Sequence, residues 1–320
     1  MHSRHTRLWR WRTAPRRRRP KVSVVKPESR QRLAMALIWV TPALWSVNYI
    51  VARMAPGVVT PHVLALGRWA IAGALLAVLA RGELWRERAA LARVWHQYVV
   101  LGFFGMVVCG AWVYLGARTT GAMNIALIYS ASPVLIALGA VLWLGERFAA
   151  RQVVGVVLAL AGVTHVVVKG QWLALADVQW VVGDAWIVLA MVSWALYALL
   201  QKHWPSTLGA TARLAATCAG GVLVLLPFSL WELGLPDTPA WSRTATILTV
   251  VAALVPGLAA YWIYGWSQKI LGASRVAVTL YLGPLYAALA AWLVLNEPLG
   301  VHHLSGAALI LPGVFLVTRR

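Results

Sequence analysis

Long apolar runs alternate with short polar connections along the whole chain after residue 32. A helix needs about 20 mostly apolar residues to cross a bilayer, and ten runs approach or reach that length. They predict spanning helices at residues 33–52, 61–80, 97–117, 123–144, 152–168, 183–201, 212–232, 246–267, 276–295 and 301–318. Because the connections are short, the pattern predicts an all-α polytopic membrane protein without a second soluble domain.

The composition supports this prediction. Hydrophobic residues make up 61% of the 320 residues and charged residues only 12%, whereas an average soluble domain is about 45–50% apolar and about 25% charged. A soluble globule of this size would lack the polar side chains to cover its surface, which excludes an ordinary cytosolic enzyme and a largely disordered chain. Cys109 and Cys218 lie in apolar runs without metal-binding spacing, so we expect neither a metal nor another cofactor.

The positive charges predict an orientation. If the N-terminus is cytoplasmic, 24 lysines and arginines fall on the inner side of the ten spans and four on the outer side. This asymmetry is the one expected from the positive-inside rule. It predicts that both termini are cytoplasmic.

Residues 1–32 form a strongly basic tail. They hold twelve lysines and arginines, among them the run Arg16-Arg17-Arg18-Arg19, and lead directly into the first full-length apolar run. We interpret the tail as a disordered cytoplasmic segment that fixes topology, or as an extension upstream of the true start. Binding to nucleic acid or anionic lipid is the alternative, but no nucleic-acid fold accompanies the charges, so we expect no nucleic-acid partner.

Two segments of the chain are related to each other. Residues 121–148 align with residues 272–299 at an offset of 151, which pairs Pro133 with Pro284 and Glu146 with Glu297. The chain therefore divides into repeats at residues 33–170 and 181–320, each with five helices. Because five is odd, the second repeat enters the membrane from the opposite side. Inverted repeats of this kind are a recurring architecture of secondary transporters.

The same segments carry a resemblance to a known family. The opening ALWSVNYIVARMAP (43–56), the span LALGRWAIAGALL around Arg68, and the segments 114–163 and 271–314 are similar to the EamA-type carriers of the drug/metabolite transporter superfamily. The resemblance implies a bacterial-type inner-membrane carrier of small metabolites. It also implies a cavity lined mainly by helices 1, 3, 4, 6, 8 and 9.

Paired helix interruptions are the best sequence indication of a carrier's site. Here they are Ser132-Pro133 in helix 4 and Gly283-Pro284 in helix 9. Each proline removes a backbone donor and frees a carbonyl one turn earlier, so the freed groups could line a wet cavity. The same faces add Asn124 on helix 4 and Thr279 and Tyr286 on helix 9. The simpler alternative is that the prolines only kink helices for packing.

Aromatic and amide side chains recur at helical spacing on three further spans. They are Trp45 and Asn48; Trp194, Tyr197 and Gln201; and Tyr261 and Tyr264. Each set lies on one helix face, and aromatic rings with a few amides would suit amphipathic or cationic solutes. The alternative is a set of aromatic belts at the membrane surfaces.

Three charged residues need separate interpretations. Arg68 lies within a span, where we expect it to pair with backbone carbonyls or to reach the membrane surface; binding a substrate carboxylate is the functional alternative. Glu146 and Glu297 end helices 4 and 9. We expect each to bind backbone amides at the start of the following helix, with proton coupling as the alternative.

The sequence thus favours a secondary transporter, with export favoured over import, that moves small metabolites such as amino acids or amphipathic or cationic compounds by alternating access. Its expected partners are a small-molecule substrate and the lipid bilayer, and a homodimer is left open. The alternatives are a carrier that flips lipid-linked sugars and, less favoured, an integral-membrane enzyme. The paired prolines, glycines and aromatics perform no bond chemistry, so we expect no enzyme activity.

Overall fold

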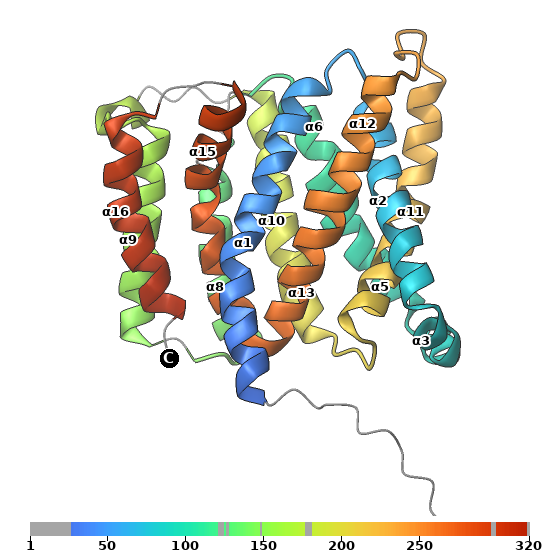
Figure 1. Cartoon of the computed structure of the whole chain (residues 1–320), viewed down its shortest axis with the longest axis horizontal. Coiled ribbons are helices and arrows are strands. Elements are labelled where there is room, and N and C mark those ends of the chain that lie inside the picture. The colour runs from blue at the N-terminus through green and yellow to red at the C-terminus, as the bar shows by residue number, and fades with distance from the viewer. Residues whose placement is uncertain are drawn as a thin grey trace, which may run out of the picture.

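The computed structural model describes residues 27–120, 125, 128–147, 149–176, 181–295 and 299–318. Every regular element within these ranges is helical. The long helices stand side by side in one bundle (Figure 1). We call the end at which α1 begins the tail end and the opposite end the far end.

The first repeat runs up and down the bundle. Its third crossing consists of three helical pieces that follow one another without a break, and its fourth is described mainly by a single helix. The elements are α1 (Pro27–Met54), α2 (Pro61–Leu79), α3 (Arg81–Arg86), α4 (Arg88–Arg93), α5 (Trp95–Gly102), η1 (Phe103–Trp112), α6 (Val113–Gly116), α8 (Ser132–Leu142) and α9 (Ala150–Val167).

The second repeat follows the same plan in the opposite direction. After the short η2 (Trp172–Leu175), its elements are α10 (Val182–His203), α11 (Ala210–Leu233), α12 (Arg243–Ala252), η3 (Ala253–Ala259), α13 (Ala260–Leu271), α14 (Ala273–Val278), η4 (Thr279–Leu282), α15 (Gly283–Leu295) and α16 (Val301–Thr318). Figure 1 shows α1 running from the tail end to the far end and α10 running the other way.

The expected all-helical fold of two inverted repeats is confirmed, but the expected count of ten uninterrupted spans is not. Eight helices in the described part of the chain are long and apolar enough to cross a membrane. The predicted span 276–295 is a chain of α14, η4 and α15, and the span 123–144 contributes only a shorter apolar helix, Ile128–Leu142. Both exceptions contain the paired prolines.

Two boundaries also differ from the prediction. Helix α1 begins at Pro27 rather than at residue 33, and residues 81–93, expected to be a plain connection, form the short helices α3 and α4 at the tail end. The apolar pattern sets where a span can lie. It does not register polar helical turns that continue beyond the span or lie at its end.

Helices pack against their own counterparts from the other repeat. Helix α2 lies against α11 and α9 against α16, while α8 of the fourth crossing lies against α14 of the ninth. Helix α1 packs on α13, and the equivalent helix α10 packs on η1 of the third crossing. Exchanging the two repeats therefore reproduces the set of neighbours, as a two-fold relation between them requires.

Four glycines bring α9 and α16 into close contact. A side chain at Gly155 would place its Cβ 2.6 Å from the carbonyl oxygen of Gly313, and a Cβ at Gly313 would lie 2.6 Å from the oxygen of Gly155. Gly162 and Gly306 approach each other in the same way, at 2.9 and 3.1 Å. The backbones touch because these positions lack side chains, as in other helix pairs packed through small residues.

We expect the double variant Gly155→Ala/Gly313→Ala to separate α9 from α16. Overpacking of this kind costs about 1–3 kcal/mol, so the apparent melting temperature of the purified protein in detergent should fall by several degrees. Gly82→Ala is the matched control, because a Cβ there meets nothing within 4 Å. Equal melting temperatures for the two variants would contradict the close contact.

Candidate solute site between the two repeats

Five aromatic side chains meet near the middle of the bundle. Trp45 comes from α1, Trp194 and Tyr197 from α10, and Tyr261 and Tyr264 from α13. We call these five residues the aromatic cluster. The ring centre of Trp45 lies 5.2 Å from that of Trp194, 5.7 Å from Tyr261 and 5.4 Å from Tyr264.

The cluster is shared by both repeats and follows from the spacing predicted on each helix. The Trp45 ring meets the rings of Trp194 and Tyr261 nearly edge-on, at interplanar angles of 89° and 90°, an arrangement that aromatic quadrupoles favour. Trp194, Tyr197, Tyr261 and Tyr264 are buried, so these four are not part of a surface belt. In this structure the rings contact one another directly and fill the centre.

The third and eighth crossings contain π-helical segments at corresponding positions. These are η1, residues 103–112, and η3, residues 253–259, which an offset of about 150 brings into register. The Tyr261 hydroxyl donates to the carbonyl oxygen of Gly105 in η1 at 2.8 Å. Segments of this kind are frequent at functional sites. Neither segment is evident from the apolar pattern, although Pro256 within η3 was a signal.

Arg68 points into the bundle next to the aromatic cluster. It is 3% exposed. Its Nη1 donates to Asn48 Oδ1 and its Nη2 to the carbonyl oxygen of Pro256, both at 3.1 Å. The guanidinium carbon lies 4.6 Å from the Trp69 ring centre and 5.9 Å from that of Tyr261. Pairing with a backbone carbonyl, as expected, therefore occurs, whereas an outward path to the membrane surface does not.

Asn48 joins this group through a second donor. The Tyr114 hydroxyl donates to Asn48 Oδ1 at 2.8 Å, so the amide oxygen accepts from both α2 and α6. Asn48 was an expected site residue, whereas Tyr114 and Trp69 were not. Trp69 adjoins Arg68 in the chain, and its ring centre lies 4.8 Å from that of Tyr261. The proximity of a tryptophan to an intramembrane arginine was the available signal.

The proline-containing interruptions lie where the sequence placed them. Helix α8 begins at Ser132 with Pro133 in its first turn, and α15 begins at Gly283 with Pro284 next, after the tight turn of η4. Ser132 and Thr279 are buried, and the Thr279 hydroxyl donates to the oxygen of Val276 at 2.7 Å. These breaks bring α8 and α14 together.

Not every expected site residue joins the aromatic cluster. Tyr286 packs against the apolar contacts of α9 and α16 instead. Gln201, one turn after Tyr197, lies at the edge of the cluster: its amide is next to Gly265 of α13, and its carbonyl accepts from Arg213 at 2.6 Å. Asn124 and Glu297 lie outside the described residues.

Glu146 caps a helix, but not the one expected. Its carboxylate accepts from the backbone nitrogens of Ala273 and Ser274 at 2.9 and 3.3 Å and from the Ser274 hydroxyl at 2.8 Å. The capped helix is α14 of the other repeat, rather than the following helix α9. The prediction that Glu146 caps α9 is therefore wrong in its partner, because the tertiary fold brings the start of α14 to it.

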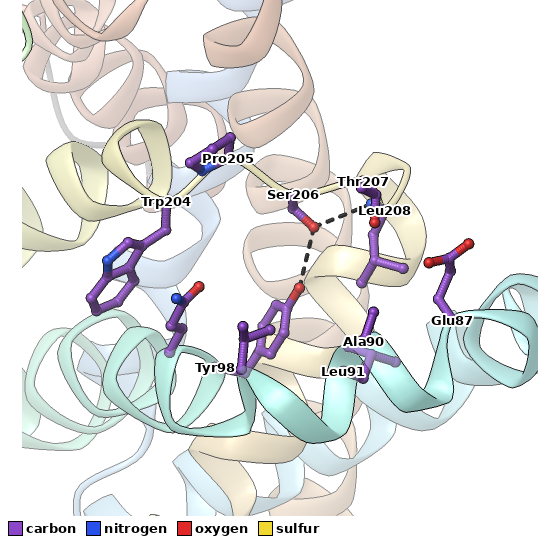
Figure 2. A pocket seen from close by; sticks show the side chains of 11 residues that line it. Glu87, Ala90, Leu91, Tyr98, Trp204, Pro205, Ser206, Thr207 and Leu208 are labelled. Atoms are coloured by element: carbon purple, nitrogen blue, oxygen red, sulfur yellow. Dashed lines mark hydrogen bonds between the residues drawn. The ribbon is translucent and has the colours of Figure 1, made fainter.

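Two hollows on the molecule lie apart from the aromatic cluster. One, of about 380 Å³, opens at the tail end between α4, α5 and the connection from α10 to α11 (Figure 2). There the Tyr98 hydroxyl lies 3.2 Å from Ser206 Oγ. The other, of about 570 Å³, follows the exposed side of α10 from Val181 to Val192. None of the expected site residues lines either hollow.

These features define a class of protein. Apolar helices long enough to span a bilayer, arranged as two inverted repeats with interruptions at equivalent places, are characteristic of multi-pass membrane carriers. The chain belongs to the EamA-like transporter family, whose sequence model matches residues 32–168 and 181–319. It is therefore a multi-pass membrane protein of a transporter family.

Several relatives resemble the chain over most of its length. An uncharacterized transporter of Archaeoglobus fulgidus is 26% identical, over 89% of this chain and 96% of its own. A protein of Streptantibioticus cattleyicolor, named a probable terminal-alkyne amino-acid exporter, is 28% identical over 80% and 84%. A crystal structure of another protein, 19% identical, superposes with a TM-score of 0.70 over 89% of this chain and 96% of its own, which shows the same fold.

Replacing Glu146 should weaken the contact between α8 and α14. A hydrogen bond to a charged group contributes about 1.5–3 kcal/mol, so Glu146→Ala should lower the apparent melting temperature by several degrees. Glu146→Gln retains one acceptor and should lower it less. Glu28→Ala is the control, since Glu28 is exposed in the first turn of α1. A Glu146→Ala melt that matches the control would rule out the cap as a stabilising contact.

Proposed function

We propose that this protein is a secondary transporter that exports small organic metabolites by alternating access, with the aromatic cluster and Asn48 as its solute site. Two halves of inverted topology supply the two access states, because each half can adopt the conformation of the other. The solute would bind where the halves meet.

The strongest support for this proposal is the pair of π-helical interruptions. The interruptions in the third and eighth crossings, η1 and η3, occupy equivalent positions, and the Tyr261 hydroxyl of α13 donates to the carbonyl oxygen of Gly105 in η1. Irregular backbone at membrane depth is tolerated where it is covered by protein or lines a cavity. Here it lies beside aromatic residues drawn from both repeats, which is the arrangement an alternating carrier needs.

We further propose that the protein lies in a bacterial-type inner membrane with its tail end facing the cytoplasm. Helix α1 begins and α16 ends at the tail end (Figure 1), and the basic residues are concentrated on the same side of the predicted topology. The charge asymmetry supports this orientation through the positive-inside rule.

Amino acids and amphipathic compounds are the substrates we favour. A relative named as a probable amino-acid exporter supports the first group, and an aromatic lining supports the second. The rings and the amide at the site bind rather than break bonds, so a transporter is favoured over an enzyme. The enclosure of the rings between helices favours a carrier over a lipid-linked-sugar flippase, whose site should open sideways to lipid.

The proposal is tested by transport in proteoliposomes. We expect uptake of labelled amino acids or amphipathic compounds by the wild-type protein. Trp45→Ala should reduce it at least tenfold, because the indole contacts three other rings of the cluster. Tyr197→Phe keeps the ring and should reduce uptake less. It tests the same site if Trp45→Ala does not fold.

Trp85→Ala is the matched control, since this indole is 69% exposed on α3. Loss of transport equal to that of Trp45→Ala would contradict the site. If no small solute is taken up and labelled lipid-linked sugar is flipped instead, the flippase alternative replaces the proposal.

A further inference from the structure

Arg68 is a buried cation whose charge is not balanced by a carboxylate. Among the described residues, no carboxylate is found within 4.0 Å of the Arg68 guanidinium; the nearest such contact on α2 is that of His62 with Glu232. The arginine is 3% exposed and its two protein hydrogen bonds go to neutral oxygens, those of Asn48 and Pro256. An arginine inside a membrane is costly and marks a functional site with a partner to be named.

Donor groups around Arg68 are also left without acceptors. Arg68 Nε and Trp69 Nε1, on adjacent residues of α2, are buried and lack a hydrogen-bond partner. Both groups can only donate. A buried donor without an acceptor is unfavourable, so the site is short of an acceptor rather than of a donor.

Glycines of the two π-helical segments lie next to these donors. A Cβ at Gly257 of η3 would lie 3.3 Å from Arg68 Nε, and a Cβ at Gly110 of η1 would lie 3.4 Å from Trp69 Nε1. The unpartnered donors therefore face the irregular segments of the third and eighth crossings. Alternating access would require both segments to move away from these donors before a solute could reach them.

We propose that Arg68, with Trp69, binds a carboxylate group of the transported solute. A carboxylate supplies both the missing negative charge and the missing acceptors, and arginine binds it with two parallel hydrogen bonds. This inference rests on the proposed transport function and specifies its substrate class.

The neighbouring rings define the rest of the solute. The ring centre of Tyr261 lies 4.8 Å from that of Trp69 and 5.7 Å from that of Trp45. The aromatic cluster therefore begins next to the arginine. A solute with its carboxylate at Arg68 places its body among these rings. The site therefore takes apolar or aromatic carboxylic acids, with amino acids bearing such side chains included.

The test uses pairs of ligands that differ only in this group. We would measure the apparent melting temperature of the full-length protein in detergent with 3-phenylpropionate against 3-phenylpropionamide, and with L-phenylalanine against L-phenylalaninamide. We expect at least a tenfold lower concentration of each acid than of its amide for the same stabilisation. Equal effects of acid and amide would overturn the inference.

Two variants assign the effect to Arg68. Arg68→Gln should remove the preference for the acids. Asn48→Asp supplies a permanent carboxylate within reach of Arg68 Nη1, so it should raise the melting temperature without ligand and abolish the stabilisation by acids. Because Asn48→Asp keeps the arginine, it decides the question if Arg68→Gln does not fold. A preference for acids that survives in Asn48→Asp would overturn the assignment.

The outcomes separate this inference from the proposed function. Transport of phenylalaninamide or another amine without transport of the acids would overturn the carboxylate site and leave a transporter in place. If neither acids nor amines are transported by the reconstituted protein, the proposed function fails as well.

Discussion

The first backbone N–H groups of a helix have no partner within the helix, and the fold supplies acceptors for several of them with carboxylates that cross between the repeats. Glu232 of α11 accepts from the backbone nitrogens of His62 and Val63 at 2.8 and 3.2 Å, at the start of α2. Glu83, its equivalent in the first repeat, accepts from Gly209 at the start of α11 at 2.6 Å. Glu146 does the same for α14. Each cap accepts from backbone N–H groups at the start of a helix and also connects one repeat to the other.

Hydrogen bonds between the repeats occur at both ends of the bundle. Glu146 and Glu83 act at the tail end; Glu232 acts at the far end, where the Thr120 hydroxyl also donates to Asp184 of the other repeat. Between the ends, the repeats meet through aromatic rings and through the irregular segments η1 and η3. Carboxylates therefore hold the ends, whereas the centre combines ring packing with the hydrogen bonds of Tyr261 to Gly105 and of Arg68 to Pro256.

Periodicity and self-similarity were enough to predict the helical class, the inversion and the broken helices. Apolar runs, an internal repeat and prolines can each be recognised directly in the sequence. The ring spacing also predicted that Trp45, Trp194 and Tyr261 share inward faces. What the sequence could not show depends on contacts between distant segments. Glu146 was assigned to the wrong helix because its true partner lies 127 residues away. The π-helical segment η1 contains no proline that could have indicated it. Tyr114 binds Asn48 across 66 residues of sequence, which no local pattern indicates.

The scaffold is symmetric, but the chemistry at its centre is not. At an offset of 149, Trp45 corresponds to Trp194, so each repeat contributes an indole to the cluster. The same offset places Thr217 where Arg68 would recur and Tyr197 where Asn48 would recur. Thr217 is satisfied within its own helix, since its hydroxyl donates to the oxygen of Arg213 at 2.9 Å. The unbalanced positive charge thus belongs to the first repeat alone. The two-fold scaffold therefore holds a centre whose two halves differ in charge, with the buried arginine on the side of the first repeat.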